Sequence, residues 1–307
     1  MLQTTIIDME TQKAFDLAKK AFDGGDIESG YVIDNSTYNA YYTKEDWSVY
    51  VRRMEAEHKD ALQSFKDGGG KELEEKFSAR YQKLYPPKMA SYASSSRFMY
   101  ELGIQFPDFQ FEIKLSTGMG RGKANLDGYL ASKNVYVEAK CHEIYKASKA
   151  EYNEAHVKLY DYLKDNCLKD NNKVFYYKDE GKYVSFSWGG EDVGRFDLKQ
   201  MLCHLSGIAR SKFNAADKRV NFVYLVYSPI GDMLNYVQCD KTRKRIKDLY
   251  NEETKNAMRI DFSLIYKHVV KYFKPSIDTS SLTEMERAFK FFFCDQNNFK
   301  ETIDNLD

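Results

Sequence analysis

The sequence predicts an α/β fold, because stretches with the periodicity of helices and of strands alternate through its middle part. Residues 109–115 alternate between apolar and polar side chains, as a half-buried strand does. Residues 196–209 carry apolar side chains at helical spacing, and residues 220–227 are mostly Val, Leu, Tyr and Phe, as in a strand buried on both faces. Helical patterns before and after this part predict a mixed α/β core with N- and C-terminal helical additions.

The first third of the chain is predicted to be helical, with breaks at its glycine and proline clusters. The glycine triplet at 68–70 and the Pro86-Pro87 pair are the clearest breaks. Capping-box-like spacing at residues 43–46 marks the start of one helix. Four helices are expected, at residues 8–22, 43–65, 71–84 and 89–102.

The same patterns divide the chain into three regions. These are a helical N-terminal region, an α/β core and a C-terminal helical region packed on that core, at residues 1–87, 88–240 and 241–307. An insertion at about 145–195 interrupts the core; it begins with a helical pattern and ends in an aromatic hairpin around Tyr176 and Phe186. The last helix of the C-terminal region is expected to open at residues 281–284.

Composition and charge narrow the class of protein. The 46 Lys and Arg residues balance 46 Asp and Glu residues, which argues against avid, non-specific coating of nucleic acid but leaves room for a local basic cleft. The five cysteines include no CxxC pair, so neither a zinc site nor a disulfide framework is indicated. The first residues lack the blocks of a signal peptide, and no apolar run approaches the roughly 18 residues of a membrane helix. We therefore expect a cytoplasmic protein with no membrane partner.

The most informative segment is a predicted hairpin that carries two carboxylates and a lysine. Asp127 precedes the turn, and Glu138 and Lys140 follow it, two residues apart and so on one face of their strand. A turn centred on residues 132–133 places Asp127 directly opposite Glu138, whereas a turn one residue later places it opposite Lys140. Directly opposed residues lie about 4.5–5.5 Å apart at Cβ, so one cation can bridge both carboxylates in the first register.

This set of side chains fits a metal-assisted phosphodiesterase site. Adjacent carboxylates repel each other unless a cation or a shared proton neutralises them, and Mg²⁺ prefers such oxygen ligands. A neighbouring lysine can hold a water and neutralise charge on a phosphate. A solvated hairpin face with a cross-strand ion pair would carry the same residues. The run Val135-Tyr136-Val137 favours an interior strand instead, where ionisable side chains need a reason.

An Asp followed on the next strand by Glu-x-Lys resembles the signature of the PD-(D/E)XK nuclease superfamily. The family's proline before the Asp is missing, because Asn125-Leu126 stands there, but that position is often degenerate in the superfamily. Without the insertion, the expected order from 88 to 228 is helix, strand, strand, strand, helix, strand, which is the αβββαβ order of the restriction-endonuclease-like core. The resemblance covers about 140 residues, less than half of the chain, and implies a central mixed sheet flanked by helices.

The resemblance also implies supporting residues. Glu101, late in the helix before the first strand, matches an acidic residue that often holds metal in the superfamily, and Glu112 on the next strand competes with it for this role. Gln200 matches a helix position whose side chain reaches the active site. His204 lies one turn further on the same face and is a candidate for contact with a phosphate of the nucleic acid. The Ala139 carbonyl is a further metal ligand by analogy. An ordinary helix-terminal glutamate and a core histidine are the alternative interpretations of Glu101 and His204.

Two basic segments are candidates for contacts with a nucleic-acid backbone. The glycine-rich loop before the Asp127 strand carries Arg121 and Lys123. A denser run at 241–247 includes Arg243 and would add a salt-dependent term to the affinity. An exposed turn and an exposed helix face explain the two segments equally well.

The function implied by the resemblance is a Mg²⁺-dependent nuclease acting on DNA, with Mn²⁺ expected to substitute. Asp127, Glu138 and Glu101 would hold the metal, while Lys140 and Gln200 would position the attacking water for hydrolysis without a covalent intermediate. RNA is an alternative substrate, and a homodimer is expected only by analogy with restriction-type nucleases. Two other hypotheses remain: a nuclease-like fold that binds nucleic acid or protein without cleavage, and an unrelated α/β protein with a charged hairpin.

Overall fold

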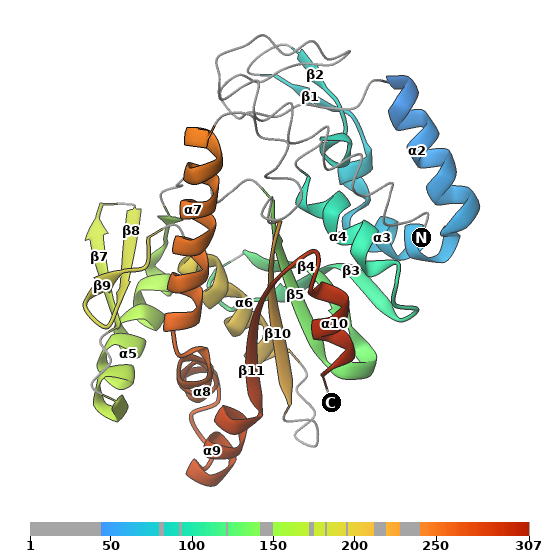
Figure 1. Cartoon of the computed structure of the whole chain (residues 1–307). Helices are drawn as coiled ribbons and strands as arrows, with labels where there is room; N and C mark the ends of the chain where they lie inside the picture. Colours follow the sequence, from blue (N-terminus) through green and yellow to red (C-terminus); the bar gives the residue numbers. More distant parts are fainter. Residues whose placement is uncertain are drawn as a thin grey trace.

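The computed structural model shows a mixed α/β protein whose helices flank a five-stranded central sheet (Figure 1). The predicted α/β class is confirmed at this level. The helix expected at residues 8–22 lies outside the described part of the chain. The structure describes residues 44–79, 83–91, 94–120, 122–141, 150–171, 175–181, 183–194, 196–211, 219–227 and 240–306.

The central sheet has the strand order β11-β10-β5-β4-β3. Strands β3, β4 and β5 form an antiparallel meander, whereas β5, β10 and β11 run parallel to one another. Strands β5 and β10 are buried along their whole length, as expected for the middle of a sheet covered on both faces. The five strands are β3 (Phe109–Ser116), β4 (Lys123–Leu130), β5 (Val135–Lys140), β10 (Val220–Val226) and β11 (Phe289–Asp295).

Helices α4 (Ser95–Gly103) and α6 (Leu198–Arg210) complete the central unit. Along the chain the order is α4-β3-β4-β5-α6-β10, with α5 (Glu154–Asn171) and a small sheet inserted before α6. This order of helix, three strands, helix and strand is the one predicted from the sequence. Both helices start at capped positions, because the side chains of Ser94 and Asp197 accept backbone N–H groups of the first turn.

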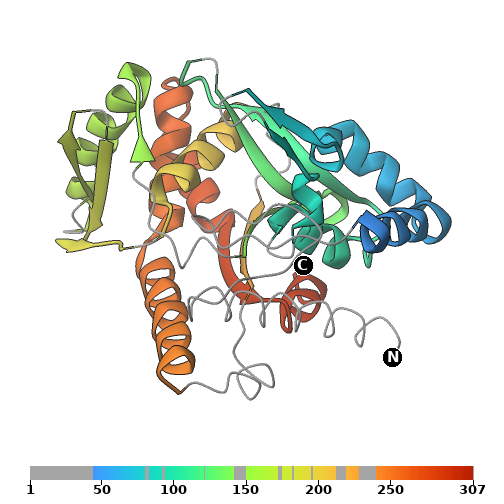
Figure 2. The same cartoon turned by 90° about the horizontal axis from the view of Figure 1, so that it is seen from above.

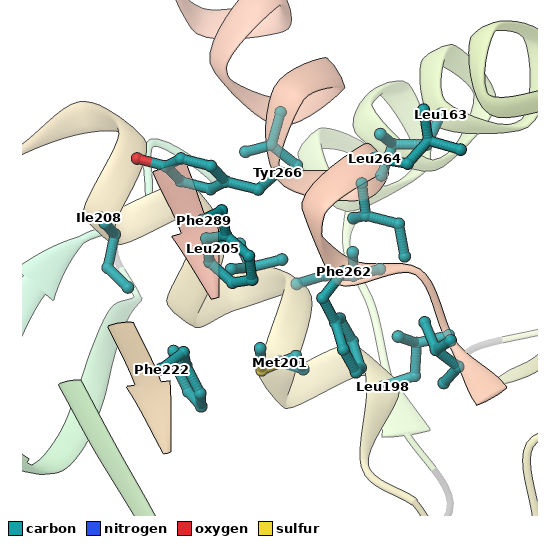
Figure 3. Close-up of a cluster of buried hydrophobic side chains, with 14 of the residues drawn as sticks. Leu163, Leu198, Met201, Leu205, Ile208, Phe222, Phe262, Leu264, Tyr266 and Phe289 are labelled. Carbon is teal, nitrogen blue, oxygen red and sulfur yellow. The ribbon is translucent and has the colours of Figure 1, made fainter. Parts of the chain in front are cut away.

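One face of the sheet is covered by α5, α6, α8 (Phe262–Phe273) and α9 (Thr279–Ala288). Figure 3 shows the centre of this hydrophobic cluster, where side chains from α6 and α8 meet others from β10 and β11. Helix α8 packs on α5, α6, α9 and β11 and is therefore buried on most sides. The labelled side chains are those of Leu163, Leu198, Met201, Leu205, Ile208, Phe222, Phe262, Leu264, Tyr266 and Phe289.

The opposite face is covered by α2 (Lys44–Glu57), α3 (Lys59–Gly69), α4 and α10 (Phe299–Asp304), which form a second hydrophobic cluster. Seen from above, α2 and α3 lie at one end of the molecule and α5 with the small sheet at the other, with the central sheet between them (Figure 2). Among the helices that the structure describes, none combines the length and the apolar character needed to span a bilayer.

The insertion consists of α5 followed by the small antiparallel sheet, as the aromatic pattern predicted. Strand β7 (Phe175–Glu180) pairs with β8 (Tyr183–Trp188), which also pairs with the short strands β6 (Ala150–Glu151) and β9 (Glu191–Asp192). The buried side of β8, which ends in Trp188, joins the same hydrophobic cluster as α5 and α6. The insertion is thus packed against the core rather than separate from it.

The helix expected at residues 71–84 is wrong. A short 3-10 turn and a two-stranded hairpin take its place: η1 (Gly70–Leu73), β1 (Lys76–Ser78) and β2 (Lys83–Tyr85). Glu72 anchors the turn, because its carboxylate accepts Lys88 Nζ at 2.6 Å and also the Ser96 hydroxyl. Tertiary contacts therefore override the helix propensity of this charged segment.

Three other helix predictions need smaller corrections. The helix expected at 89–102 is a short 3-10 turn, η2 (Lys88–Ala90), followed by α4 from Ser95. The stretch at 43–65 is two helices, because α2 ends before His58 and α3 begins after it. Helix α9 begins at Thr279, two residues before the expected opening at 281–284, because Asp278 caps it by accepting the Ser281 N–H. It is also followed by α10, so it is not the last helix.

The C-terminal region is not only helical, contrary to the prediction. Strand β11 enters the central sheet parallel to β10, so the chain beyond residue 240 supplies a strand as well as packing helices. The segment Phe-Lys-Phe-Phe-Phe-Cys-Asp is aromatic and suits a strand. The boundary predicted at residue 240 therefore divides two parts that share one sheet.

Candidate active site

The turn between β4 and β5 decides which side chains face each other. The two strands pair from Gly128 with Val137 to Leu130 with Val135, and one further step in this register places Asp127 opposite Glu138. The first of the two predicted registers is confirmed. At this step the backbone ladder ends and the Asp127 carboxylate takes over, because its Oδ2 accepts the Ala139 N–H at 2.7 Å.

Strand β3 changes faces at Glu112, whose φ of 54° is uncommon for a residue other than glycine. Phe109 and Phe111 before it belong to the hydrophobic cluster on the α4 side of the sheet. Ile113 and Leu115 after it pack against the cluster on the α6 side. The strand therefore rotates at Glu112, and the alternation of its side chains is reversed beyond this point.

Three carboxylates consequently share one row across neighbouring strands. The β3–β4 pairs on either side of Glu112 place it opposite Asp127, which in turn is opposite Glu138. Strand β4 also changes faces here, because Leu126 packs on the α6 side and Leu130 on the α4 side. The local rotation of two strands thus brings acidic side chains from β3, β4 and β5 to the same level of the sheet.

Helix α6 encloses the Glu138 end of this row. Lys140 Nζ donates to Glu138 Oε1 at 2.6 Å and to Gln200 Oε1 at 2.5 Å. His204 Nε2 lies 3.0 Å from Glu138 Oε2, although the two atoms are not aligned for a hydrogen bond. Glu138 is 2% exposed, Lys140 7% and His204 1%, so the charges interact with little screening by water. The predicted placement of Gln200 and His204 on one helix face beside the hairpin lysine is confirmed.

The protonation of the three carboxylates follows from their surroundings. Burial, and then repulsion from Glu138 and Glu112, raises the pKa of Asp127 well above its usual range. Burial and the nearby Glu72 raise the pKa of Glu112 to about 7. Burial is the largest single influence on Glu138 and acts to raise its pKa, but Lys140 and His204 together outweigh it, and the pKa of Glu138 is lowered to about 2. The row therefore contains one firmly ionised carboxylate and two that readily take up a proton.

The two candidates for a third acidic residue have different neighbours. Glu101 accepts the Tyr50 hydroxyl at 2.5 Å, and its second oxygen lies 3.9 Å from Arg53 Nη2, so these contacts join α4 to α2. Glu112 lies in the same row as Asp127 and influences its pKa. The structure thus places Glu112 next to the predicted metal pair, and Glu101 at the contact between α4 and α2.

Of the residues proposed to contact nucleic acid, His204 is buried in the interior, and the other three lie at the margins of the described structure. Lys123 begins β4 and is exposed to solvent. Arg121 lies outside the described residues. Arg243 belongs to α7 (Asp240–Arg259), but its side chain is outside the described part as well.

Several residues close to the site were missed from the sequence. The group of Glu72, Lys88 and Ser96 lies near Glu112, and the charge of Lys88 is also felt by Asp127. The helical pattern of residues 71–84 gives no sign that Glu72 contacts Lys88 and Ser96. Tyr224, opposite Glu138 on β10, and its partner Glu253 were also not predicted from the sequence, since neither stands in a recognisable motif.

The donor chemistry of the site fits a divalent cation. Asp127 and Glu138 offer hard oxygen ligands, and Glu138 Oε2 is buried without a hydrogen-bond partner among the described residues. The raised pKa of Asp127 reflects negative charge that a cation would neutralise. In the described residues, no group of three or more His, Cys, Asp and Glu side chains is arranged to hold a metal. A cation here would take two carboxylates and complete its shell with backbone oxygen or water.

Comparison of the chain with protein-family models, with curated proteins and with solved structures found no match. The functional assignment therefore depends on the residues and the geometry described above.

Proposed function

We propose that this protein is a Mg²⁺-dependent nuclease that hydrolyses phosphodiester bonds in DNA. The observation that supports it most directly is the pairing of Asp127 with Glu138 across β4 and β5, with Lys140 held beside Glu138 by Gln200. The spacing of Asp127 and Glu138-x-Lys140 and the αβββαβ order are those of the PD-(D/E)XK nucleases that the sequence resembles. We expect Mn²⁺ to substitute for Mg²⁺.

The roles of the residues follow from their charges and contacts. Asp127 and Glu138 would hold the cation, which when bound supplies positive charge to a phosphate oxygen. The Lys140 ammonium, directed by Gln200 Oε1, would donate hydrogen bonds to the attacking water and neutralise charge that builds on the phosphate. His204, whose Nε2 lies 3.0 Å from the far oxygen of Glu138, would interact with that carboxylate through charge rather than through an aligned hydrogen bond. Water adds directly to phosphorus as the bond to the leaving oxygen breaks; the water releases its proton to solvent, and the leaving oxygen takes up a proton from solvent.

The Asp127→Asn variant tests this proposal without threatening the fold. Because burial and repulsion already favour the neutral form of Asp127, the amide should be tolerated, while one cation ligand is lost. Wild type and variant would be incubated with supercoiled plasmid, linear duplex DNA, single-stranded DNA and RNA, each with Mg²⁺, Mn²⁺ or EDTA. We expect metal-dependent cleavage by the wild type and a loss of at least about 100-fold in the variant.

Two further variants complete the assay. Asp165→Asn changes an exposed aspartate on α5 and should cleave as the wild type does. Lys140→Ala removes the ammonium and should be inactive although the carboxylates remain. Undiminished cleavage by both Asp127→Asn and Lys140→Ala would reject the assignment, and the substrate that is cut would identify the class of nucleic acid.

The second candidate is a protein that binds nucleic acid on this fold without cleaving it. One contact favours it: Lys140 and Glu138 are ion-paired and buried, so each charge is satisfied without a metal. This function predicts a shift of labelled DNA or RNA in a binding assay that EDTA leaves unchanged, together with no binding of Mn²⁺. Binding of Mn²⁺ that disappears in Asp127→Asn would favour the nuclease instead.

A further inference from the structure

Glu253 on α7 is a buried carboxylate that the proposed reaction does not use. It is 1% exposed, although the residues on either side of it in the helix, Glu252 and Thr254, reach solvent. Its Oε1 accepts the Tyr224 hydroxyl at 3.4 Å, which is long for such a bond, and its Oε2 has no hydrogen-bond partner among the described residues. Burial raises the pKa of Glu253 to about 7. A buried acid with so little compensation requires an explanation.

The position of Glu253 relates it to the candidate active site. Its partner Tyr224 is opposite Glu138 in the parallel register of β10 and β5, and the two side chains lie on the same face of the sheet. The positive charge of Lys140 acts on Glu253 and opposes the effect of burial on its pKa. Glu253 on α7 thus contacts the sheet at β10, on the side of Glu138 away from Asp127.

Lys140 and a cation would compete for the same carboxylate. The ammonium already occupies Glu138 Oε1 at 2.6 Å, and a divalent cation held by Asp127 and Glu138 would repel it. Gln200 is neutral and cannot replace the lost charge. A buried ammonium without an anionic partner is strongly unfavourable, so Lys140 needs a second anion if Glu138 is to serve the cation.

We propose that Glu253 is a positioning residue that provides this second anion, so that the Lys140 ammonium turns one N–H toward Glu253 when a cation binds and keeps another N–H for the attacking water. The inference rests on the proposed function, because it assumes a cation at Asp127 and Glu138. Glu253 itself touches neither cation nor substrate. Its open Oε2 is the acceptor, and its long bond to Tyr224 keeps the carboxylate turned toward the sheet.

The test measures Mn²⁺ affinity by calorimetry and by electron paramagnetic resonance, independently of cleavage. Glu253→Gln keeps the shape of the side chain and removes its charge, so it should fold with an unchanged or higher melting temperature. We expect its Kd for Mn²⁺ to rise about tenfold, because Lys140 then stays on Glu138. Glu253→Asp keeps the negative charge but moves it further from Lys140, and should give a smaller rise in the Kd for Mn²⁺. Glu252→Gln, an exposed neighbour on the same helix, should match the wild type.

A double-mutant cycle separates this role from a structural one. In a Lys140→Met background no ammonium competes for Glu138, so adding Glu253→Gln should leave the Mn²⁺ affinity unchanged. An equal loss of affinity with and without Lys140, or no loss in Glu253→Gln, would overturn the inference and leave the nuclease proposal standing. A wild-type protein that binds no Mn²⁺ would overturn both.

Discussion

Helix α6 carries two stripes of side chains that face the interior, one apolar and fully buried, the other polar and only partly buried at Gln200. Leu198, Met201, Leu205 and Ile208 are spaced three and four residues apart and face the apolar cluster around α8 (Figure 3). Gln200 and His204, four residues apart, face β5 and hold the polar pair Glu138 and Lys140. The apolar stripe attaches the helix to the core, and the polar stripe turns part of the same interface into a site.

The apolar stripe and the ion pair beside the polar stripe are expected to affect the free energy of unfolding differently. Each buried leucine removes apolar surface from water, which stabilises the fold by about 1.5–3 kcal/mol. A buried ion pair must first be desolvated, and replacing such a pair by apolar residues is often neutral or stabilising. The residues around Glu138 are therefore expected to be poor for stability. Their retention in the interior is the physical argument that they serve a function.

The largest effect should come from removing one charge of the Glu138–Lys140 pair that the polar stripe contacts. Lys140→Met leaves Glu138 buried beside His204 without its ammonium, which should lower the free energy of unfolding by about 3–5 kcal/mol. The double variant Glu138→Gln, Lys140→Met removes both charges and should recover most of this loss. Urea unfolding in EDTA measures both. If the double variant were as unstable as the single one, the pair would be a packing element and the contrast between the stripes would fail.

The apolar stripe should respond in a simpler way. Leu205 is fully buried, so Leu205→Ala should lower the free energy of unfolding by about 2–5 kcal/mol through lost burial and a residual cavity. Leu84→Ala makes the same change at a side chain that is 49% exposed, and should stay within about 0.5 kcal/mol of the wild type. Both values come from urea unfolding. If the protein is the proposed nuclease, DNA cleavage per folded molecule should be unchanged in Leu205→Ala, and a specific loss of cleavage would show that the two stripes are coupled.

Much of the central unit was predictable because it depends on local patterns. The alternation of residues 109–115 and the Val135-Tyr136-Val137 run predict their strands, and the turn between β4 and β5 then places Asp127 opposite Glu138. Helical spacing places Gln200 and His204 on one side of α6. These patterns depend only on a few neighbouring residues, so they can be recognised without knowledge of the tertiary structure.

The features that were missed depend on residues far apart in the chain. The turn at Glu72 is held by Lys88 and Ser96, and β11 becomes a strand of the sheet because it pairs with β10. No local pattern reveals either partner. Glu253 stands beside Glu252 in the same charged helix, and only the packing of α7 on the sheet buries one and exposes the other.

Glu112 is the clearest case of a residue whose position relative to Asp127 could not be predicted from the sequence. Whether it or Glu101 joins Asp127 depends on the positive φ of Glu112, which rotates β3 and reverses its faces. No alternation pattern predicts a non-glycine residue in that conformation, because it is uncommon and is imposed by the surrounding structure. Which of the two glutamates lies beside Asp127 can therefore be read only from the three-dimensional structure.

The smallest effect concerns this carboxylate and depends on pH. Because the pKa of Glu112 is raised to about 7 by burial and by Glu72, folding favours its protonated form. That stabilisation is present in full below the ordinary pKa of a glutamate and is lost as the pH rises through about 7. Wild type should thus lose on the order of 1–3 kcal/mol between pH 4.5 and pH 8 relative to Glu112→Gln, which cannot ionise.

Urea unfolding at pH 4.5, 6 and 8 in EDTA measures this difference. Glu74→Gln, an exposed glutamate in the same region, should follow the wild type at every pH. Mg²⁺ should reduce the loss at pH 8, because a cation in the row favours the ionised carboxylates that folding otherwise opposes. Parallel stability curves for wild type and Glu112→Gln would mean that Glu112 is solvated, and the acidic row would then contain only Asp127 and Glu138.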